Sequence, residues 1–371
     1  MEKLNMANLR RLLTTQTDLA VTMYIPMHTS ASPPHISENQ IRFKNIAHKA
    51  IEELKARRNY NLADHLEAVI NEHHDDLNFW KEQTPGLLVC GANEDINMYH
   101  LPINTEEYMS IDKGFHLAPL LGVISDSHQF YVLELAEHNP KLLLGDLYGL
   151  RETGIFLPAS YKDAVMQQEN ASSFAHTSHE NSPYARTTGY PSRFFKIIDK
   201  ILIDKADKKL PLILAGTEKE VAEFRELSKY PNILKNSVTN GYDKSHLRDL
   251  FEKVSIIVHN EIVLPEHKSA AEEYLQLEKS APERTASTEE EILEASKLGR
   301  IDKLFTKMSL ETTDNVQDSL LPLPRITFFE PRLNSVLSQL AYNVWKMRGM
   351  VFNFMPSEMP NSEPVLAKLR Y

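Results

Sequence analysis

Hydrophobic and polar positions in the first third of the chain follow both the strand and the helix period. Val21-Thr22-Met23-Tyr24-Ile25 is a β-branched and aromatic run closed by Pro26, which predicts a strand. An apolar stripe with helical spacing then predicts a helix beginning near Ser37, with Gln40 completing a capping box. A second helix is predicted from Leu62 to Trp80. The stripe consists of Phe43, Ile46, Ala47, Ala50, Ile51 and Leu54.

The middle third begins with strand-like runs. Leu121 to Ser125 and Gln129 to Leu135 predict a hairpin around Asp126-Ser127-His128, and Lys141 to Gly145 predicts a third strand. From Gly149 to Gly189 the sequence is polar and has no period, which predicts a functional or mobile loop. Residues 102–116, before these strands, have no sustained period and predict a connector.

Order returns after the loop. A helix is predicted from Pro191, a strand at Leu212-Ile213-Leu214-Ala215 ended by Gly216, and a further helix with Thr217 and Glu220 as a capping box.

In the last third, Thr288 and Glu291 predict the start of another capped helix, which Gly299 ends. Ile301 to Phe305 and Met350 to Phe354 predict strands on either side of a helix from Leu333 to Lys346. Residues 309–331 form a proline-rich spacer. The fold class expected from this pattern is α/β (α+β mixed). We expect three domains, at residues 1–113, 114–264 and 265–371.

Composition adds the general class. The chain has 371 residues, 42% hydrophobic and 25% charged, which is typical of a globular protein of two or three domains. Its one cysteine, Cys90, cannot form an internal disulfide, so a reducing, cytoplasmic location is expected. No apolar run has the length of a signal peptide or a membrane span, and we expect no membrane association.

The net charge of −10 argues against a general nucleic-acid binder, and we expect no DNA partner. The charge is uneven, however. Residues 1–113 carry −5, residues 114–264 carry −2 and residues 265–371 carry −3. A local RNA contact is therefore expected in the middle third.

Five short motifs resemble, in the right order, segments of one family. They are Val21-Thr22-Met23-Tyr24-Ile25-Pro26, Pro85-Gly86-Leu87-Leu88-Val89-Cys90-Gly91, Leu212-Ile213-Leu214-Ala215-Gly216, Gly299-Arg300-Ile301-Asp302-Lys303-Leu304-Phe305 and Leu369-Arg370-Tyr371. Together they resemble the archaeo-eukaryotic class-one peptide-chain release factors and Pelota, and within that group the bacterial family 3.

The resemblance implies a three-domain chain with a ribonuclease-H-like middle domain and an L7Ae-like C-terminal domain. It also implies a cytoplasmic translation factor that binds the ribosome or tRNA, with a translational GTPase as a further partner. No cofactor is expected.

The sequence departs from the family at its catalytic tip. Release factors hydrolyse peptidyl-tRNA with a Gly-Gly-Gln tip, whose glycines allow backbone angles that other residues avoid. None of the 12 glycines here is adjacent to another, and Gln167-Gln168 lacks flanking glycines. The segment nearest to the expected stop-codon motif is Asn59-Tyr60-Asn61-Leu62. Stop-codon-dependent release and enzymatic activity are therefore not expected, and no catalytic residue is assigned.

A basic stripe on the predicted helix after Pro191 is the candidate RNA-binding site. Arg193, Lys196 and Lys200 follow one another at i, i+3 and i+7, with Arg186 just upstream. Cations grouped in this way can neutralise RNA phosphates. The alternative is a solvated face offset by acidic residues. Those residues are Asp199, Asp204 and Asp207, and the core face opposite is Phe194, Ile197, Ile198, Ile201 and Leu202.

Other polar groups carry weaker hypotheses. Arg42, Asn45 and Lys49 form a similar stripe on the first helix, for which solvent exposure is the preferred interpretation. His73-His74-Asp75-Asp76 does not predict a metal site, because adjacent helical residues point about 100° apart. His176 and His179 have no metal-ligand spacing.

Two alternative functions stay open. One is a metal-dependent RNA-processing enzyme that uses carboxylates such as Asp126, Glu134 and Asp146. The other is a non-enzymatic adaptor that binds protein through its C-terminal domain. The function we expect first is a release-factor-like factor in ribosome rescue or translational stress.

Overall fold

The computed structural model describes residues 2–15, 17–125, 128–136, 138–165, 190–239, 247–307, 331–354 and 358–371. This part of the chain contains three separate sheets with helices between their strands, which confirms the mixed α/β class. The chain divides into two compact units, Met1–Asp126 with Glu266–Tyr371, and Ser127–Pro265. The predicted domain boundaries near residues 113 and 264 stay a prediction.

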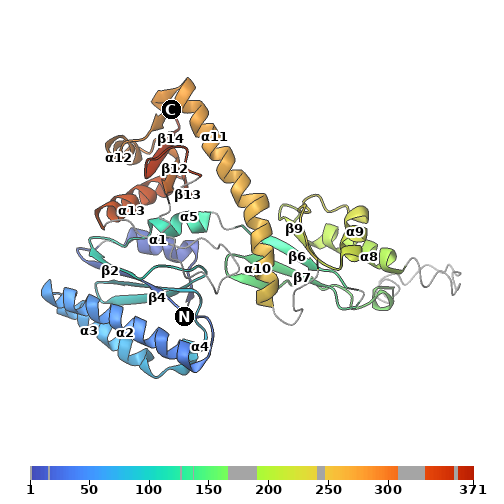
Figure 1. Ribbon diagram of the computed structural model, residues 1–371, viewed down its shortest axis with the longest axis horizontal. Coiled ribbons are helices and arrows are strands. Elements are labelled where there is room, and N and C mark those ends of the chain that lie inside the picture. The colour runs from blue at the N-terminus through green and yellow to red at the C-terminus, as the bar shows by residue number, and fades with distance from the viewer. Residues whose placement is uncertain are drawn as a thin grey trace, which may run out of the picture. The chain divides into compact units, whose positions relative to one another are not determined.

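The first unit begins with a five-stranded sheet in the order β1-β4-β3-β2-β5. All its neighbouring strands are antiparallel except β1 and β4, which are parallel. Figure 1 shows α2 and α3 on one face of this sheet and α1 and α5 on the other. The elements are β1 (Glu2–Lys3), α1 (Met6–Thr14), β2 (Ala20–Pro26), α2 (Pro33–Ala56), α3 (Tyr60–His74), α4 (Leu77–Lys81), β3 (Gly86–Ala92), β4 (Asp95–Leu101), β5 (Tyr108–Asp112) and α5 (Ala118–Ser125).

A four-stranded sheet completes the first unit, in the order β11-β14-β12-β13. On one face, Ala270 and Tyr274 of α11 pack against Phe305, Phe354 and Leu366 of the strands. The elements are α11 (Leu264–Ser280), η2 (Pro282–Arg284), β11 (Thr285–Ala286), α12 (Glu289–Lys297), β12 (Ile301–Lys307), α13 (Pro331–Lys346), β13 (Met350–Phe354) and β14 (Val365–Leu369).

The second unit has its own five-stranded sheet, in the order β10-β9-β6-β7-β8. Alternate residues of β6 enter different cores: Tyr131 and Leu133 pack with α8, whereas Phe130 and Val132 pack with α10. Both faces of the sheet are therefore buried by helices. The elements are β6 (Phe130–Glu134), β7 (Lys141–Asp146), β8 (Gly149–Glu152), α8 (Tyr190–Lys205), β9 (Leu212–Gly216), α9 (Glu218–Leu227), β10 (Val238–Thr239), α10 (Leu247–Val258) and the π-helix η1 (His259–Val263).

Five details of the sequence prediction were wrong. The helix predicted from Leu62 to Trp80 is two helices, α3 and α4, because the Asp76 side chain caps the start of a new helix. Leu121 to Ser125 lies in helix α5 and not in a strand, because Leu120, Leu121 and Val123 are buried where α5 contacts α13 and β13. Residues 102–116 contain strand β5, which pairs with β2. Helix α2 begins at Pro33, with Ser32 as its N-cap, because proline suits the first helical turn. The predicted loop from Gly149 begins with strand β8.

Several predicted boundaries are confirmed. Thr217 and Glu220 form a complete capping box at the start of α9, and the Thr288 side chain accepts from the Glu291 amide at the start of α12. Gly299 has φ +68°, the left-handed conformation that ends a helix and favours glycine. Among the helices that the structure describes, none combines the length and the apolar character needed to cross a membrane.

Candidate nucleic-acid interface

Helix α8 carries the predicted basic stripe on the side opposite its core face. The core face differs from the predicted one in three residues. Phe194, Phe195, Ile198 and Leu202 are buried, whereas Ile197 and Ile201 are only partly buried. The Phe195 ring contacts Phe224 of α9, with 5.9 Å between ring centroids. These contacts fix the rotation of α8, and thereby the direction in which its polar residues point.

The cations of α8 point toward solvent, as predicted. Arg193, Lys196 and Lys200 are all exposed. Lys196 and Lys200 form no ion pair within the described residues. Both ammonium groups are therefore available to an anionic partner.

The acidic residues that the sequence set against these cations have different surroundings. Asp199 is 6% exposed, and its carboxylate accepts from the Lys229 amide at 3.1 Å and from the Ser228 hydroxyl. Asp207 is exposed and accepts from the Lys209 amide at 3.0 Å. Asp204 is exposed one turn beyond Lys200. The buried Asp199 is thus used to hold the α9–β10 connection and not to neutralise the stripe.

Several sequence candidates lie outside the described residues. They are Arg186, Gln167, Gln168, His176, His179 and the proline-rich spacer 309–331. The RNA-binding role of Arg186, Arg193, Lys196 and Lys200 stays a prediction.

Side chains of the His73–Asp76 segment make local contacts at the start of helix α4. Asp76 caps α4 by accepting from the amides of Asn78 and Phe79 at 3.0 and 3.1 Å. The His73 ring stacks on Phe79, with 4.2 Å between centroids. Within the described ranges, no three His, Cys, Asp or Glu side chains are grouped so that they could hold a metal ion.

Two carboxylates of the nuclease alternative, Glu134 and Asp146, do not meet. Glu134 and Asp146 lie at opposite ends of the β6–β7 hairpin, because Glu134 pairs with Lys141 and Phe130 with Gly145. Asp146 forms an ion pair with Arg151 and accepts from the Tyr148 amide. Asp126 lies outside the described residues. Glu134 and Asp146 therefore cannot share a pair of metal ions.

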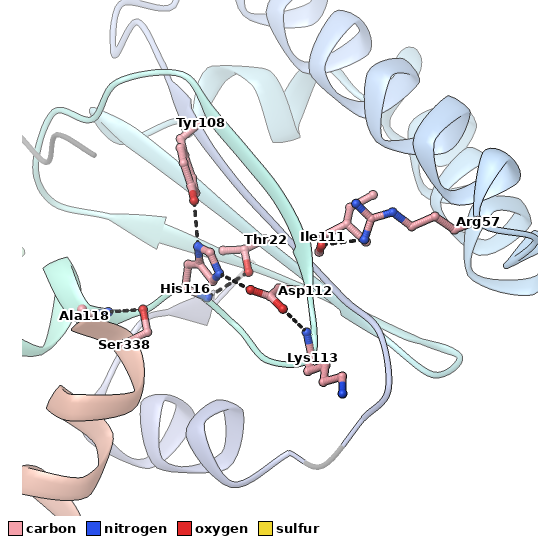
Figure 2. A network of polar contacts seen from close by, with 9 residues as sticks. All are labelled: Thr22, Arg57, Tyr108, Ile111, Asp112, Lys113, His116, Ala118 and Ser338. Carbon is pink, nitrogen blue, oxygen red and sulfur yellow. Dashed lines mark hydrogen bonds and ion pairs between the residues drawn. The ribbon is translucent and has the colours of Figure 1, made fainter. Parts of the chain in front are cut away.

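A buried polar network that the sequence did not predict lies between β5 and α5 (Figure 2). The His116 side chain is 4% exposed, with Nδ1 2.7 Å from the Tyr108 hydroxyl and Nε2 3.2 Å from Asp112 Oδ2. Burial lowers the pKa of His116, and the hydrogen bond to Asp112 partly opposes this.

Tyr108, His116 and Asp112 are connected in the order in which a proton relay would connect them, but the His116 ring is buried from solvent. The main chain of His116 instead ties the segment between β5 and α5 to strand β2. The His116 amide donates to Thr22 Oγ1 at 3.2 Å, and the His116 carbonyl accepts from the Tyr24 hydroxyl at 2.7 Å. Two residues on, the Ala118 amide donates to Ser338 Oγ of α13 at 3.4 Å (Figure 2). We assign the network a structural role. Nothing in the aperiodic sequence around it signals a strand or a buried histidine.

Comparison with known proteins confirms the family resemblance over part of the chain. Residues 129–300 match the sequence model of Bacterial archaeo-eukaryotic release factor family 3. This range includes α8 and its basic stripe. The class that the match supports is a translation-related, release-factor-like protein. No curated protein sequence matches the chain.

Several solved structures are similar to the chain at low identity. The archaeal translation termination factor aRF1 is 14% identical, with 98% of this chain and 96% of that chain covered and a TM-score of 0.24. Archaeoglobus fulgidus Pelota is 16% identical, with 77% and 79% covered and a TM-score of 0.37. S. cerevisiae Dom34, titled a translation termination-like factor, is 11% identical, with 76% and 74% covered and a TM-score of 0.35.

Proposed function

We propose that this protein is a release-factor-like translation factor that binds the ribosome or tRNA and acts in ribosome rescue or translational stress. The observation that carries the proposal is the exposed stripe Arg193, Lys196 and Lys200, inside the segment that matches the release-factor family. The buried Asp199 leaves Asp204 as the exposed carboxylate within the helix on that side. Ribosomal RNA and tRNA are the polyanions that such a factor meets.

The proposal excludes peptide release through a Gly-Gly-Gln tip. The sequence has no two adjacent glycines, and a tip without them cannot adopt the backbone angles that the two glycines supply. We therefore expect the protein to occupy a ribosome without hydrolysing peptidyl-tRNA. A translational GTPase that binds the predicted L7Ae-like domain is included as the partner that the family resemblance implies.

Co-sedimentation with bacterial ribosomes at low and high salt tests the binding. The triple variant Arg193→Gln, Lys196→Gln, Lys200→Gln should bind about tenfold more weakly at low salt. Because each lost phosphate contact lowers the dependence of log K on log salt by about 0.7–0.9, its slope should fall by about 2. The matched control replaces Arg42, Lys44 and Lys49 by glutamine.

Two results would contradict the proposal. Equal salt slopes for the wild type and the α8 variant would make the stripe a solvated face. Release of peptide from stop-programmed ribosomes, at a rate comparable with that of a true termination factor, would contradict the non-hydrolytic part.

A further inference from the structure

Four arginines mark one end of the four-stranded sheet of the first unit, one for each strand. Arg284 directly precedes β11, Arg300 directly precedes β12 and Arg348 lies two residues before β13. Arg370 directly follows β14, which runs antiparallel to β11 and β12. In the sheet order β11-β14-β12-β13, these arginines therefore form a row, which we call the arginine row. Adjacent strands lie about 4.8 Å apart, so the row places the backbone of one arginine at roughly each strand spacing.

Main-chain oxygens hold three of these side chains in place. The Arg284 guanidinium donates to the Arg370 carbonyl at 3.2 Å, and the Arg370 guanidinium donates to the carbonyl of Met347. Arg300 donates to the main-chain oxygen of Tyr371 at 2.8 Å, and its guanidinium lies 5.5 Å from the centre of the Tyr371 ring. Bonds to the peptide carbonyls of Arg370 and Met347 fix the guanidinium groups of Arg284 and Arg370 without neutralising their charge. The row is therefore preorganised and cationic.

Arg348 is exposed, as is Arg370, and lies beside the start of β12. The neighbouring Gly349 packs so closely that a side chain there would lie 2.9 Å from the Ile301 carbonyl. Arg348 itself is exposed and makes no side-chain hydrogen bond or ion pair within the described residues.

Carboxylates do not compensate the row. Among the described residues, no Asp or Glu side chain forms an ion pair with any of the four arginines, and the Nε groups of Arg284 and Arg300 are buried without a hydrogen-bond partner. Two carboxylates are near in sequence: Glu283, which is exposed, and Asp302, whose Oδ2 lies 2.9 Å from the Lys368 ammonium. Lys303 and Lys368 of this sheet are thus paired with acids, whereas none of its four arginines is paired with an Asp or Glu side chain of the described residues.

We propose that the arginine row binds the phosphates of single-stranded RNA. Arginine presents a planar fork of donors that matches phosphate oxygens in pairs. The row places one such arginine beside each of four adjacent strands, and a nucleic-acid strand carries negative charges at short intervals. Tyr371, 68% exposed, offers a ring on which a base can stack beside the Arg300 guanidinium. The inference rests on the proposed function, because the arginine row would be a second RNA contact besides the α8 stripe. The row and α8 belong to different units.

Fluorescence anisotropy of a labelled 12-nucleotide oligouridylate with the full chain tests this inference. The triple variant Arg284→Gln, Arg348→Gln, Arg370→Gln should bind about tenfold more weakly at 100 mM salt. Its dependence of log K on log salt should fall by about 2, since a contact to single-stranded phosphate contributes about 0.7. The control triple Lys44→Gln, Lys113→Gln, Lys268→Gln removes the same charge from exposed positions elsewhere in the unit and should change affinity less than twofold.

A variant with one substitution tests the inference even if the triple variant does not fold. Arg348→Gln alone removes an exposed side chain that anchors no described group, and it should weaken binding about two- to threefold. Arg370→Lys keeps the charge but loses the fork, and it should recover only part of the affinity.

Equal affinity and equal salt slopes for the row variant and its control would overturn the proposal. The proposal would also be overturned if the row variant lost binding to a labelled oligoglutamate peptide but bound RNA like the wild type. That result would assign the row to an acidic protein partner. The α8 variant in the same assay separates the two hypotheses. If it binds RNA like the wild type and the row variant does not, the row stands and the α8 interface fails.

Discussion

Helices α2 and α8 carry the same basic pattern but place it in different surroundings. Arg42, Asn45 and Lys49 on α2 have the same i, i+3, i+7 spacing as Arg193, Lys196 and Lys200 on α8. On α2, Arg42 is half-buried and donates to the Pro26 carbonyl at 3.3 Å. Lys49 lies 3.3 Å from a carboxylate oxygen of Glu107.

The difference between the helices lies in what surrounds the cations. The α2 stripe is partly used within its own unit, by a carbonyl and a carboxylate. The Lys196 and Lys200 ammonium groups of α8 have no ion pair in the described part of the chain. Spacing along a helix therefore identifies a charged face, but the tertiary structure decides whether that charge is free to bind a partner.

Each helix also has one buried polar residue that ties it to a neighbouring segment, and removing that residue should produce the largest change in stability. On α2, Asn39 is fully buried and forms two 2.8 Å bonds with the main chain of His28. On α8, Asp199 accepts from Ser228 and Lys229. Replacing either by alanine leaves buried donors unsatisfied and should cost about 2–3 kcal/mol, measured by urea unfolding.

The Asp199→Ala variant also tests the comparison directly. Because its carboxylate is held by main-chain and hydroxyl donors, its loss should leave ribosome binding at low salt within about twofold of the wild type. A much larger increase in affinity would mean that Asp199 does offset the α8 cations, and the contrast with α2 would disappear. Asn39→Ala, which changes no charge, is the control.

The sequence was sufficient for the elements whose residues interact locally. The period of the apolar stripes predicted α2 and α8, and the capping boxes placed α9 and α12. It was insufficient where distant partners decide. Leu121 to Ser125 contains β-branched and apolar residues suitable for a strand, and only its contacts with α13 and β13 explain the helix.

The same limit applies to the candidate sites. The charge pattern predicted that Arg193, Lys196 and Lys200 face solvent, because a helix with one apolar face exposes the other. It could not show that Asp199 is buried, since Ser228 and Lys229 lie about thirty residues away in sequence. It also could not find the arginine row, because its members flank four different strands and are brought side by side only by the order of the sheet.

Acid should weaken the sheet beneath α2 by a moderate amount. His100 of β4 is buried, and burial, together with the positive charges of the N-terminus and Lys3, lowers its pKa to about 4. The folded state therefore binds a proton less readily than the unfolded chain, whose histidine has a pKa near 6.5. The resulting stability is fully present above pH 6.5 and is lost as the pH falls toward 4.

Native-state hydrogen exchange, followed as the pH is lowered, measures this loss of stability in the first sheet and α2. Between pH 7 and pH 5.5 we expect the first sheet and α2 to lose about 1–2 kcal/mol of protection through His100, on the scale of about 1.4 kcal/mol per pKa unit. The variant His100→Gln should remove most of that pH dependence. An unchanged pH profile in this variant would show that other groups cause the loss.

The smallest expected effect comes from releasing Lys49 on α2. Glu107→Gln removes its carboxylate partner, and because both side chains are largely exposed, the free energy of unfolding should fall by less than about 1 kcal/mol. Arg42 stays bound to the Pro26 carbonyl, so only one cation becomes available. Ribosome affinity should therefore rise less than twofold, and the salt slope should change by at most about 1, measured by co-sedimentation as for the α8 variant. If Glu107→Gln instead bound ribosomes several-fold more tightly, the ion pair between Lys49 and Glu107 would be the only difference between the α2 and α8 stripes. The partial burial of Arg42 and the place of α2 in the chain would then not be needed to explain why the two stripes differ in binding.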